Sequence, residues 1–162
     1  MQLVRLGESM QFKKNYYEKS LKGSIMKRAF YDAKPPKYEA VGNGSYLYRW
    51  DIQEEVITNE MTSSSDENDE PSERVQYSCF EVVVWSPVTS NKITEAVIST
   101  ICSASHEQKL VNEYNAANLG MVGGSKTSEE AKQRIAAYKE FLEYRAALKE
   151  RVDADCSELG IK

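Results

Sequence analysis

The chain has 162 residues with a net charge of −4, and 41% of them are hydrophobic and 28% charged, so it has room for one modest globular core. No apolar run reaches the roughly 18 residues of a membrane span, and the negative charge gives no general attraction to nucleic acid. The three cysteines, Cys79, Cys102 and Cys156, lack metal-ligand spacing and the even number of a disulfide framework, which makes buried thiols the expectation.

Residues 1–29 form a basic segment that differs from the rest of the chain. They contain seven Lys or Arg residues against two Glu, and a second methionine, Met26, precedes a sequence typical of the start of a compact domain. Three interpretations stay open: an upstream extension of the reading frame, a short amphipathic or disordered arm, and a contact with nucleic acid. The segment has no apolar signal-peptide core, so synthesis in the cytoplasm is expected.

Residues 30–104 are predicted to form a β-meander and a first helix. Residues 38–41 and 45–52 should pair as a hairpin, because Asn43-Gly44 tolerates positive φ at both central turn positions. Alternation in the second of these strands predicts two faces. The face expected to cover the core holds Tyr46, Tyr48, Trp50 and Ile52, and the other face holds Leu47, Arg49 and Asp51.

Residues 59–74 are predicted to be a long mobile loop, because their acidic and Ser-rich middle has no apolar residue to offset chain entropy. A calcium loop is the alternative, but the central glycine of that motif is missing. Residues 75–86 alternate again as a strand. Its end, Val82–Trp85, is apolar on both faces, so it should be central and covered on both sides. An antiparallel sheet of three to four strands is expected.

Residues 105–162 are predicted to be a helical region. The first helix, which precedes this region, is expected over 91–103 with Thr89 or Ser90 as its N-cap. The second helix should open with a capping box at Ser105–Gln108. After a glycine joint, another capping box opens a long helix over 128–159, which Gly160 ends. The fold class predicted is α+β: a small antiparallel sheet, then two short helices and one long C-terminal helix.

The chain contains no nucleotide-binding glycine pattern, nucleophile elbow or His/Cys cluster, so no catalytic residue, cofactor or metal site is predicted and the protein is expected not to be an enzyme. Residues 120–124 have the glycines of a phosphate loop but follow no strand, and are interpreted as an interhelical linker. Tyr46, Tyr48 and Trp50 could stack on nucleic-acid bases, although such strand faces are more often core.

The long helix is the hypothesised partner surface. Its aromatics cannot share one narrow stripe, because residues advance by about 100° around a helix. Leu142 lies on the stripe that recurs at steps of three or four, with Phe141 and Tyr144 on either side of it, and one side of the helix is expected to contact the chain's own sheet. The other side would bind a second copy or another protein, with Tyr138, Phe141 and Tyr144 as anchors and Arg145 as a polar clamp. The alternative is that the helix only packs along its own sheet and shorter helices.

Five segments within residues 26–160 carry a resemblance: Phe30-Tyr31-Asp32-Ala33-Lys34-Pro35-Pro36, Gly42-Asn43-Gly44-Ser45-Tyr46, Val84-Trp85-Ser86-Pro87-Val88-Thr89, Asn91-Lys92-Ile93-Thr94-Glu95-Ala96-Val97-Ile98 and Asn115-Ala116-Ala117-Asn118-Leu119-Gly120. They resemble small proteins encoded in phages and prophages of gut Bacteroidales. The layout, with the helical segment 138–148, also resembles tail-fibre assembly proteins, although no fibre-tip binding signature is found.

The resemblance implies a bacteriophage morphogenesis protein, made in the host bacterial cytoplasm and acting as a minor tail or virion component or as a tail-fibre assembly factor. Its partner would be a phage tail or fibre protein, or a second copy, and no membrane. Two alternatives stay open. One is a phage-encoded host-interaction protein that binds a bacterial protein, and the other is weak nucleic-acid binding through the basic N-terminal segment.

Overall fold

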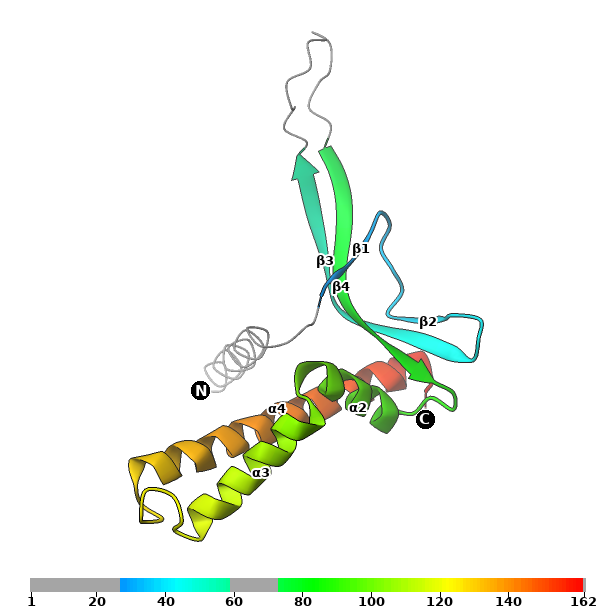
Figure 1. Cartoon of the computed structure of the whole chain (residues 1–162). Helices are drawn as coiled ribbons and strands as arrows, with labels where there is room; N and C mark the ends of the chain where they lie inside the picture. The colour runs from blue at the N-terminus through cyan, green and yellow to red at the C-terminus, as the bar shows by residue number, and fades with distance from the viewer. Residues whose placement is uncertain (1–26, 59–72, 162) are drawn as a thin grey trace, which may run out of the picture. The chain divides into compact units, whose positions relative to one another are not determined.

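The chain folds into two units, a sheet unit within residues 27–87 and a helical unit from residue 88 onward (Figure 1). This computed structural model describes residues 27–58 and 73–161. Along the chain, the division between the two units falls at 87/88, just after the last strand. The predictions for residues 1–26 and for 59–72, which include most of the acidic loop, lie outside the described residues.

The sheet unit has four antiparallel strands in the order β1-β4-β3-β2, as the predicted fold class requires. The strands are β1 (Ala29–Tyr31), β2 (Tyr38–Ala40), β3 (Ser45–Thr58) and β4 (Glu73–Trp85). Both long strands outrun their predicted limits. β3 continues past Ile52, and β4 includes Glu73 and Arg74, which the sequence predicts to lie in the loop. Three-residue β1 was not predicted, because so short a segment has no readable alternation.

The β2–β3 hairpin is present, but its turn is longer than the predicted Asn-Gly turn. Positive φ falls on Gly42 (95°) and Gly44 (85°) and not on Asn43. Val41 N donates to Ser45 O at 3.0 Å, and the Asn43 side-chain oxygen accepts from Ser45 N at 3.1 Å. Two glycines therefore supply the left-handed residues, while Asn43 ties the turn through its side chain.

A β-bulge interrupts the pairing of β3 with β4. Trp50 pairs with Phe80 and Gln53 with Ser78, so Asp51 and Ile52 together lie opposite one residue of β4. Asp51 adopts a φ of 52°, a left-handed conformation that aspartate tolerates better than most residues. The predicted alternation therefore holds up to Trp50 and shifts beyond it.

The two faces of the sheet differ in how far their side chains are buried. Tyr48 and Trp50 are buried with ring centroids 5.9 Å apart, and Trp50 also packs on Phe80, so the predicted core face is confirmed at these two residues, while Tyr46 and Ile52 are half-buried. On the opposite face Val83 and Trp85 are 52% and 59% exposed. The expectation that this end of β4 is covered on both sides was wrong, because an apolar run does not by itself bring a second layer.

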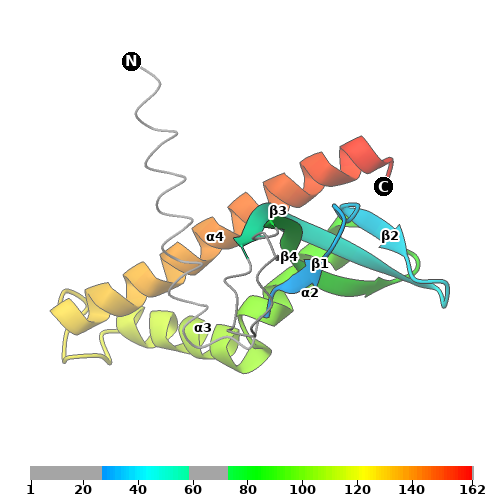
Figure 2. The ribbon, with the colours of Figure 1, turned by 90° about the horizontal axis from the view of Figure 1, so that it is seen from above.

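The helical unit has the two short helices and one long helix that the sequence predicts: α2 (Ser90–Ile101), α3 (Ala104–Asn118) and α4 (Glu129–Leu159). Helices α3 and α4 run side by side in opposite directions (Figures 1 and 2), and α2 also contacts α4. The predicted N-cap of α2 is confirmed as Thr89, whereas α4 is capped by Ser128, which accepts from Ala131 N, so the predicted capping box of Thr127 with Glu130 is not formed. Helix α3 begins earlier than expected, because Ser103 is its cap and accepts from His106 N.

Helix α4 buries different sides along its length. Near its start Ala131 joins Ala117 and Val122 in a cluster of small residues, where α3 and α4 approach closely. Further on the buried residues are Phe141, Tyr144, Leu148, Val152 and Cys156. At about 100° per residue, Tyr144 lies roughly 140° around the helix from Ala131. One straight stripe therefore does not describe this helix. Its end is the predicted one, at Gly160 with a φ of 70°.

Candidate functional site

The described part of the chain lacks a metal-ligand cluster and a membrane-spanning helix, and its cysteine thiols are buried. No cluster of three or more His, Cys, Asp or Glu residues that could hold a metal ion occurs within residues 27–58 and 73–161. Over the same residues, no helix has an apolar stretch long enough to cross a membrane. Cys79, Cys102 and Cys156 are buried free thiols, and desolvation raises the pKa of each, which lowers its thiolate fraction.

Ser90 and Lys149 have the spacing of a serine–lysine pair, but their hydrogen bonds run in the wrong direction for nucleophile activation. Lys149 Nζ donates to Ser90 Oγ at 2.8 Å, and the Ser90 hydroxyl donates to Asp153. Lys149 also forms an ion pair with Asp153, and these bonds lower the pKa of that carboxyl. A general base must accept the serine proton, so this cluster instead ties the start of α2 to α4.

The glycine-rich loop between α3 and α4 precedes a helix N-terminus, as a phosphate loop would. The hydroxyl of Ser128 caps that terminus by accepting from Ala131 N at 3.1 Å. Glu129 and Glu130 place carboxylates in the first turn, where they disfavour a bound anion. The interpretation as an interhelical linker agrees with this arrangement.

The most elaborate polar cluster of the sheet unit surrounds Arg49 on the face opposite Tyr48 and Trp50. Its side chain is 2% exposed and forms ion pairs with Glu39 at 2.8 Å and Glu81 at 3.1 Å. It also donates to the Pro36 carbonyl at 3.0 Å and to the Tyr31 hydroxyl at 3.2 Å from Nη2. Arg49 of β3 thus contacts β1, the connector (the segment between β1 and β2), β2 and β4.

Burial alone would lower the pKa of Arg49, but hydrogen bonds to Glu39, Tyr31 and Glu81 outweigh that effect and raise it. The same contacts act on Tyr31, whose hydroxyl donates to Glu81 at 2.6 Å; desolvation and this carboxylate raise the pKa of Tyr31. The buried charge is therefore compensated by neighbours. The Arg49 side chain has a structural role, since its guanidinium donates to groups of the protein itself.

A second arginine, Arg28, holds the β-bulge. Its guanidinium donates to the Asp51 carboxylate at 2.7 Å and to the Asp51 carbonyl at 2.6 Å. It also donates to Ser78 and lies 4.5 Å from the centre of the Phe80 ring. These bonds explain how Asp51 is kept at positive φ, with both strands fixed at the point where the pairing shifts.

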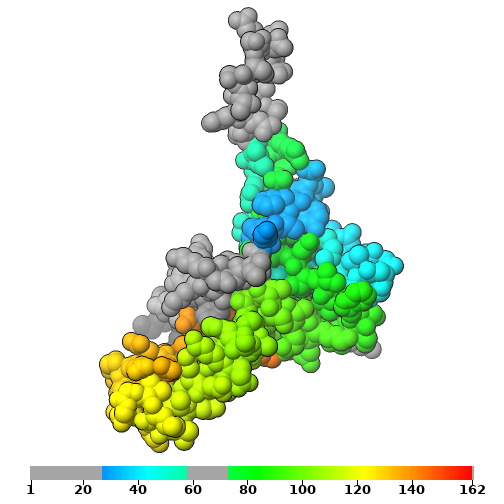
Figure 3. All heavy atoms as spheres, viewed as in Figure 1, coloured from blue at the N-terminus to red at the C-terminus, as the bar shows by residue number. Residues whose placement is uncertain are grey.

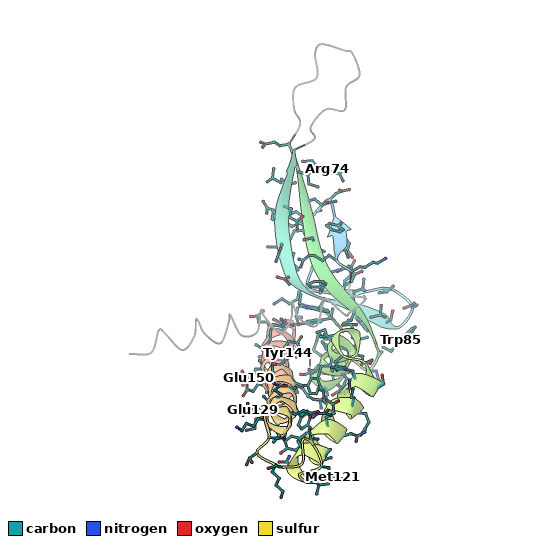
Figure 4. All side chains as sticks on the ribbon, turned by 60° about the vertical axis from the view of Figure 1, so that its left-hand side comes forward. Arg74, Trp85, Met121, Glu129, Tyr144 and Glu150 are labelled. Atoms are coloured by element: carbon teal, nitrogen blue, oxygen red, sulfur yellow. The ribbon has the colours of Figure 1, made fainter. Side chains whose placement is uncertain are left out.

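Beyond the bulge, β3 and β4 continue as a ribbon (residues 53–58 and 73–78), which is two-stranded from the pair Glu55–Gln76 outward because β1 still pairs with Tyr77 and Ser78. Figure 4 labels Arg74 near its outer end and Trp85 at the other end of β4. The ribbon exposes Val56 (58%), Ile57 (37%) and Val75 (42%). Within the described residues, β2 pairs only with Tyr46–Tyr48 and leaves the outer edge of β3 beyond the bulge without a strand. This ribbon is the candidate interaction element of the sheet unit.

The hypothesised partner residues of α4 are placed differently from what the sequence indicated. Phe141 and Tyr144 are 1% and 7% exposed, whereas Leu142, which lies between them on the recurring stripe, is 44% exposed. Tyr138 packs on Tyr114 of α3 with ring centroids 4.9 Å apart. Arg145 forms ion pairs with Glu95 of α2 and Glu107 of α3, so it clamps the three helices together. Partner binding by α4 stays a prediction, but buried rings cannot serve as exposed anchors.

Sequence reasoning missed the buried Arg49 and the ribbon. Arg49 alternates with aromatics as an outward-facing residue would, and only the folded connector reveals its burial. The alternation of Val56 with its neighbours was a weak signal for the ribbon, obscured by Glu54 and Glu55. Comparisons with protein-family models, curated proteins and solved structures found no match.

Replacing Arg49 by methionine should lower the free energy of unfolding of the sheet unit by about 2–4 kcal/mol, because Glu39, Glu81 and the Pro36 carbonyl lose their shared donor. Arg74→Met is the matched control, since Arg74 is 58% exposed and its ion pair with Asp32 is also exposed, so a change below about 0.5 kcal/mol is expected. Urea unfolding followed by tryptophan fluorescence measures both. Equal losses would contradict a special role for Arg49.

Phe141→Ala should destabilise the helices by about 3–5 kcal/mol, because a nearly fully buried ring leaves a cavity. Leu142→Ala, at the adjacent exposed position, should cost less than about 1 kcal/mol. Thermal unfolding followed by circular dichroism at 222 nm compares the two. If Phe141→Ala melts like the wild-type protein, the ring is not core and an exposed-anchor role is restored.

Proposed function

We propose that the protein is a non-enzymatic bacteriophage morphogenesis protein, acting as a minor component of the tail or virion or as a tail-fibre assembly factor. The phage assignment rests on the five segments that resemble phage and prophage proteins of gut Bacteroidales. The observation that carries the binding role is the β3–β4 ribbon, whose exposed aliphatic side chains and open strand edge suit contact with another protein.

The paired polar clusters support a binding role over a catalytic one. Arg49, Arg28 and Arg145 each connect three or more segments of their own unit, and Lys149 and Ser90 link two helices. Such contacts stiffen a scaffold. A stiff scaffold favours assembly, because less conformational entropy is lost when a partner binds.

The test is mass spectrometry of virions purified from the phage or prophage that encodes the chain. We expect the protein either in virions, in fixed ratio to a tail protein, or outside them in a complex with a fibre protein. A host cytosolic protein of similar abundance serves as the contamination control.

Absence from both pools, together with co-purification of a bacterial protein, would contradict the proposal and favour the host-interaction alternative. The nucleic-acid alternative is checked separately with the full-length chain. A gel shift that survives about 150 mM salt would support it, because non-specific phosphate contacts weaken steeply with salt.

A further inference from the structure

We propose that the outer edge of β3 beyond the bulge, residues 53–57, accepts an extended basic segment of a partner protein as an added strand. This names the partner surface of the proposed assembly function and rests on that function for its biological setting. The binding step itself depends only on the geometry and charge of the ribbon.

The backbone of this edge is open on one side. β4 pairs with the inner side of β3 from Gln53 to Thr58, while β2 stops at the pair Tyr38–Tyr48 and Lys37 O accepts from Arg49 N. No described strand continues along the outer side of Gln53–Ile57. A row of backbone donors and acceptors at such an edge is the standard template for strand addition.

The other edge of the ribbon suits an added strand less well. On β4, β1 already pairs with Tyr77, Ser78 and Cys79, and Arg74 forms an ion pair with Asp32 in the segment after β1. In Figure 3 the blue atoms of the β1 region lie against the green and teal atoms of the ribbon. The β3 edge is therefore the longer open one.

The side chains of β3 specify the chemistry of the added strand. Alternation puts Glu54 and Val56 on one face and Glu55 and Ile57 on the other, so each face presents an acid followed by an aliphatic residue. Glu54 accepts from the Tyr77 hydroxyl at 3.1 Å, and Glu55 accepts from Ser78 Oγ at 2.7 Å, which holds both carboxylates along the ribbon. Each carboxylate has lone pairs for a further donor.

A complementary antiparallel strand would thus carry two β-branched residues followed by two lysines or arginines. The aliphatic pair would meet Ile57 and Val56, and the basic pair would meet Glu55 and Glu54. Cross-strand pairs of these kinds are favourable, while like charges directly opposite each other are not. A second copy of this chain fits less well, because the antiparallel register that overlaps residues 53–57 of two copies completely places Glu55 directly opposite Glu55.

The binding test uses the full-length protein and a fluorescein-labelled hexapeptide of sequence Thr-Val-Val-Lys-Lys-Thr, followed by fluorescence anisotropy. Two control peptides are matched in length: one has glutamates in place of the lysines, and one has N-methyl groups on alternate backbone amides. We expect the lysine peptide to bind and the N-methylated peptide to lose binding, because an added strand needs its backbone donors.

The charge test reverses the charge of two residues on the protein. Glu54→Lys/Glu55→Lys should weaken the lysine peptide by at least about tenfold and admit the glutamate peptide instead. The matched control, Glu143→Lys/Glu150→Lys, makes the same charge change at exposed positions of α4 and should leave the lysine peptide unaffected. Circular dichroism checks that both variants are folded, and gain of the glutamate peptide is a readout that an unfolded variant cannot give.

Three results would overturn the inference: no binding of the lysine peptide, equal binding of the N-methylated peptide, or equal weakening by the α4 control. Dimerisation of the wild-type protein that the charge swap abolishes would also overturn it and make a second copy the occupant. The outcome is separable from the virion experiment. If the protein binds the peptide but is absent from virions and fibre complexes, only the phage role is contradicted. If it is incorporated into virions but does not bind the peptide, only strand addition is contradicted.

Discussion

The buried guanidinium of Arg49 is the contact on which the sheet unit depends. The sheet has two long strands, but its edge strands β1 and β2 have three residues each and so offer few backbone bonds. Arg49 supplies side-chain bonds that hold Tyr31, the Pro36 carbonyl, Glu39 and Glu81 around one point. An unpaired charge at 2% exposure would be very costly. The connector between β1 and β2 must therefore fold back over the sheet, and this fixes where both edges lie.

Arg28 has a comparable role where the ribbon begins. By binding the side chain and carbonyl of Asp51 and packing on Phe80, it stabilises the bulge that re-registers β3. Bulges increase local twist and end regular pairing. The base of the sheet is therefore held by the contacts of Arg49 and Arg28, and β3 and β4 extend from it as a simpler two-stranded ribbon. A binding element of this kind combines an anchored position with accessible backbone groups, which is the requirement for recognising another chain by strand addition.

Local features of the fold were predictable and tertiary ones were not. Thr89 and Gly160 mark helix ends through hydrogen bonds with immediate neighbours, so the sequence alone reveals them. The α+β class follows from a change in periodicity along the chain. In contrast, the burial of Arg49 depends on a segment that returns to it across the sheet. The burial of Phe141 and the exposure of Leu142 depend on which elements pack against α4, and α4 contacts both α2 and α3. Among the candidate site residues, Tyr138 and Arg145 contact other helices of their own unit.

Amide hydrogen exchange, measured with and without the lysine hexapeptide, tests the central claim that the base of the sheet is braced and the β3 edge beyond the bulge receives a partner strand. The account predicts slow exchange at residues 46–50 and 78–84 in the protein alone, faster exchange at 53–57, and added protection by the peptide at 53–57. Deep protection of 53–57 before the peptide is added, or peptide-induced protection confined to α4, would contradict it.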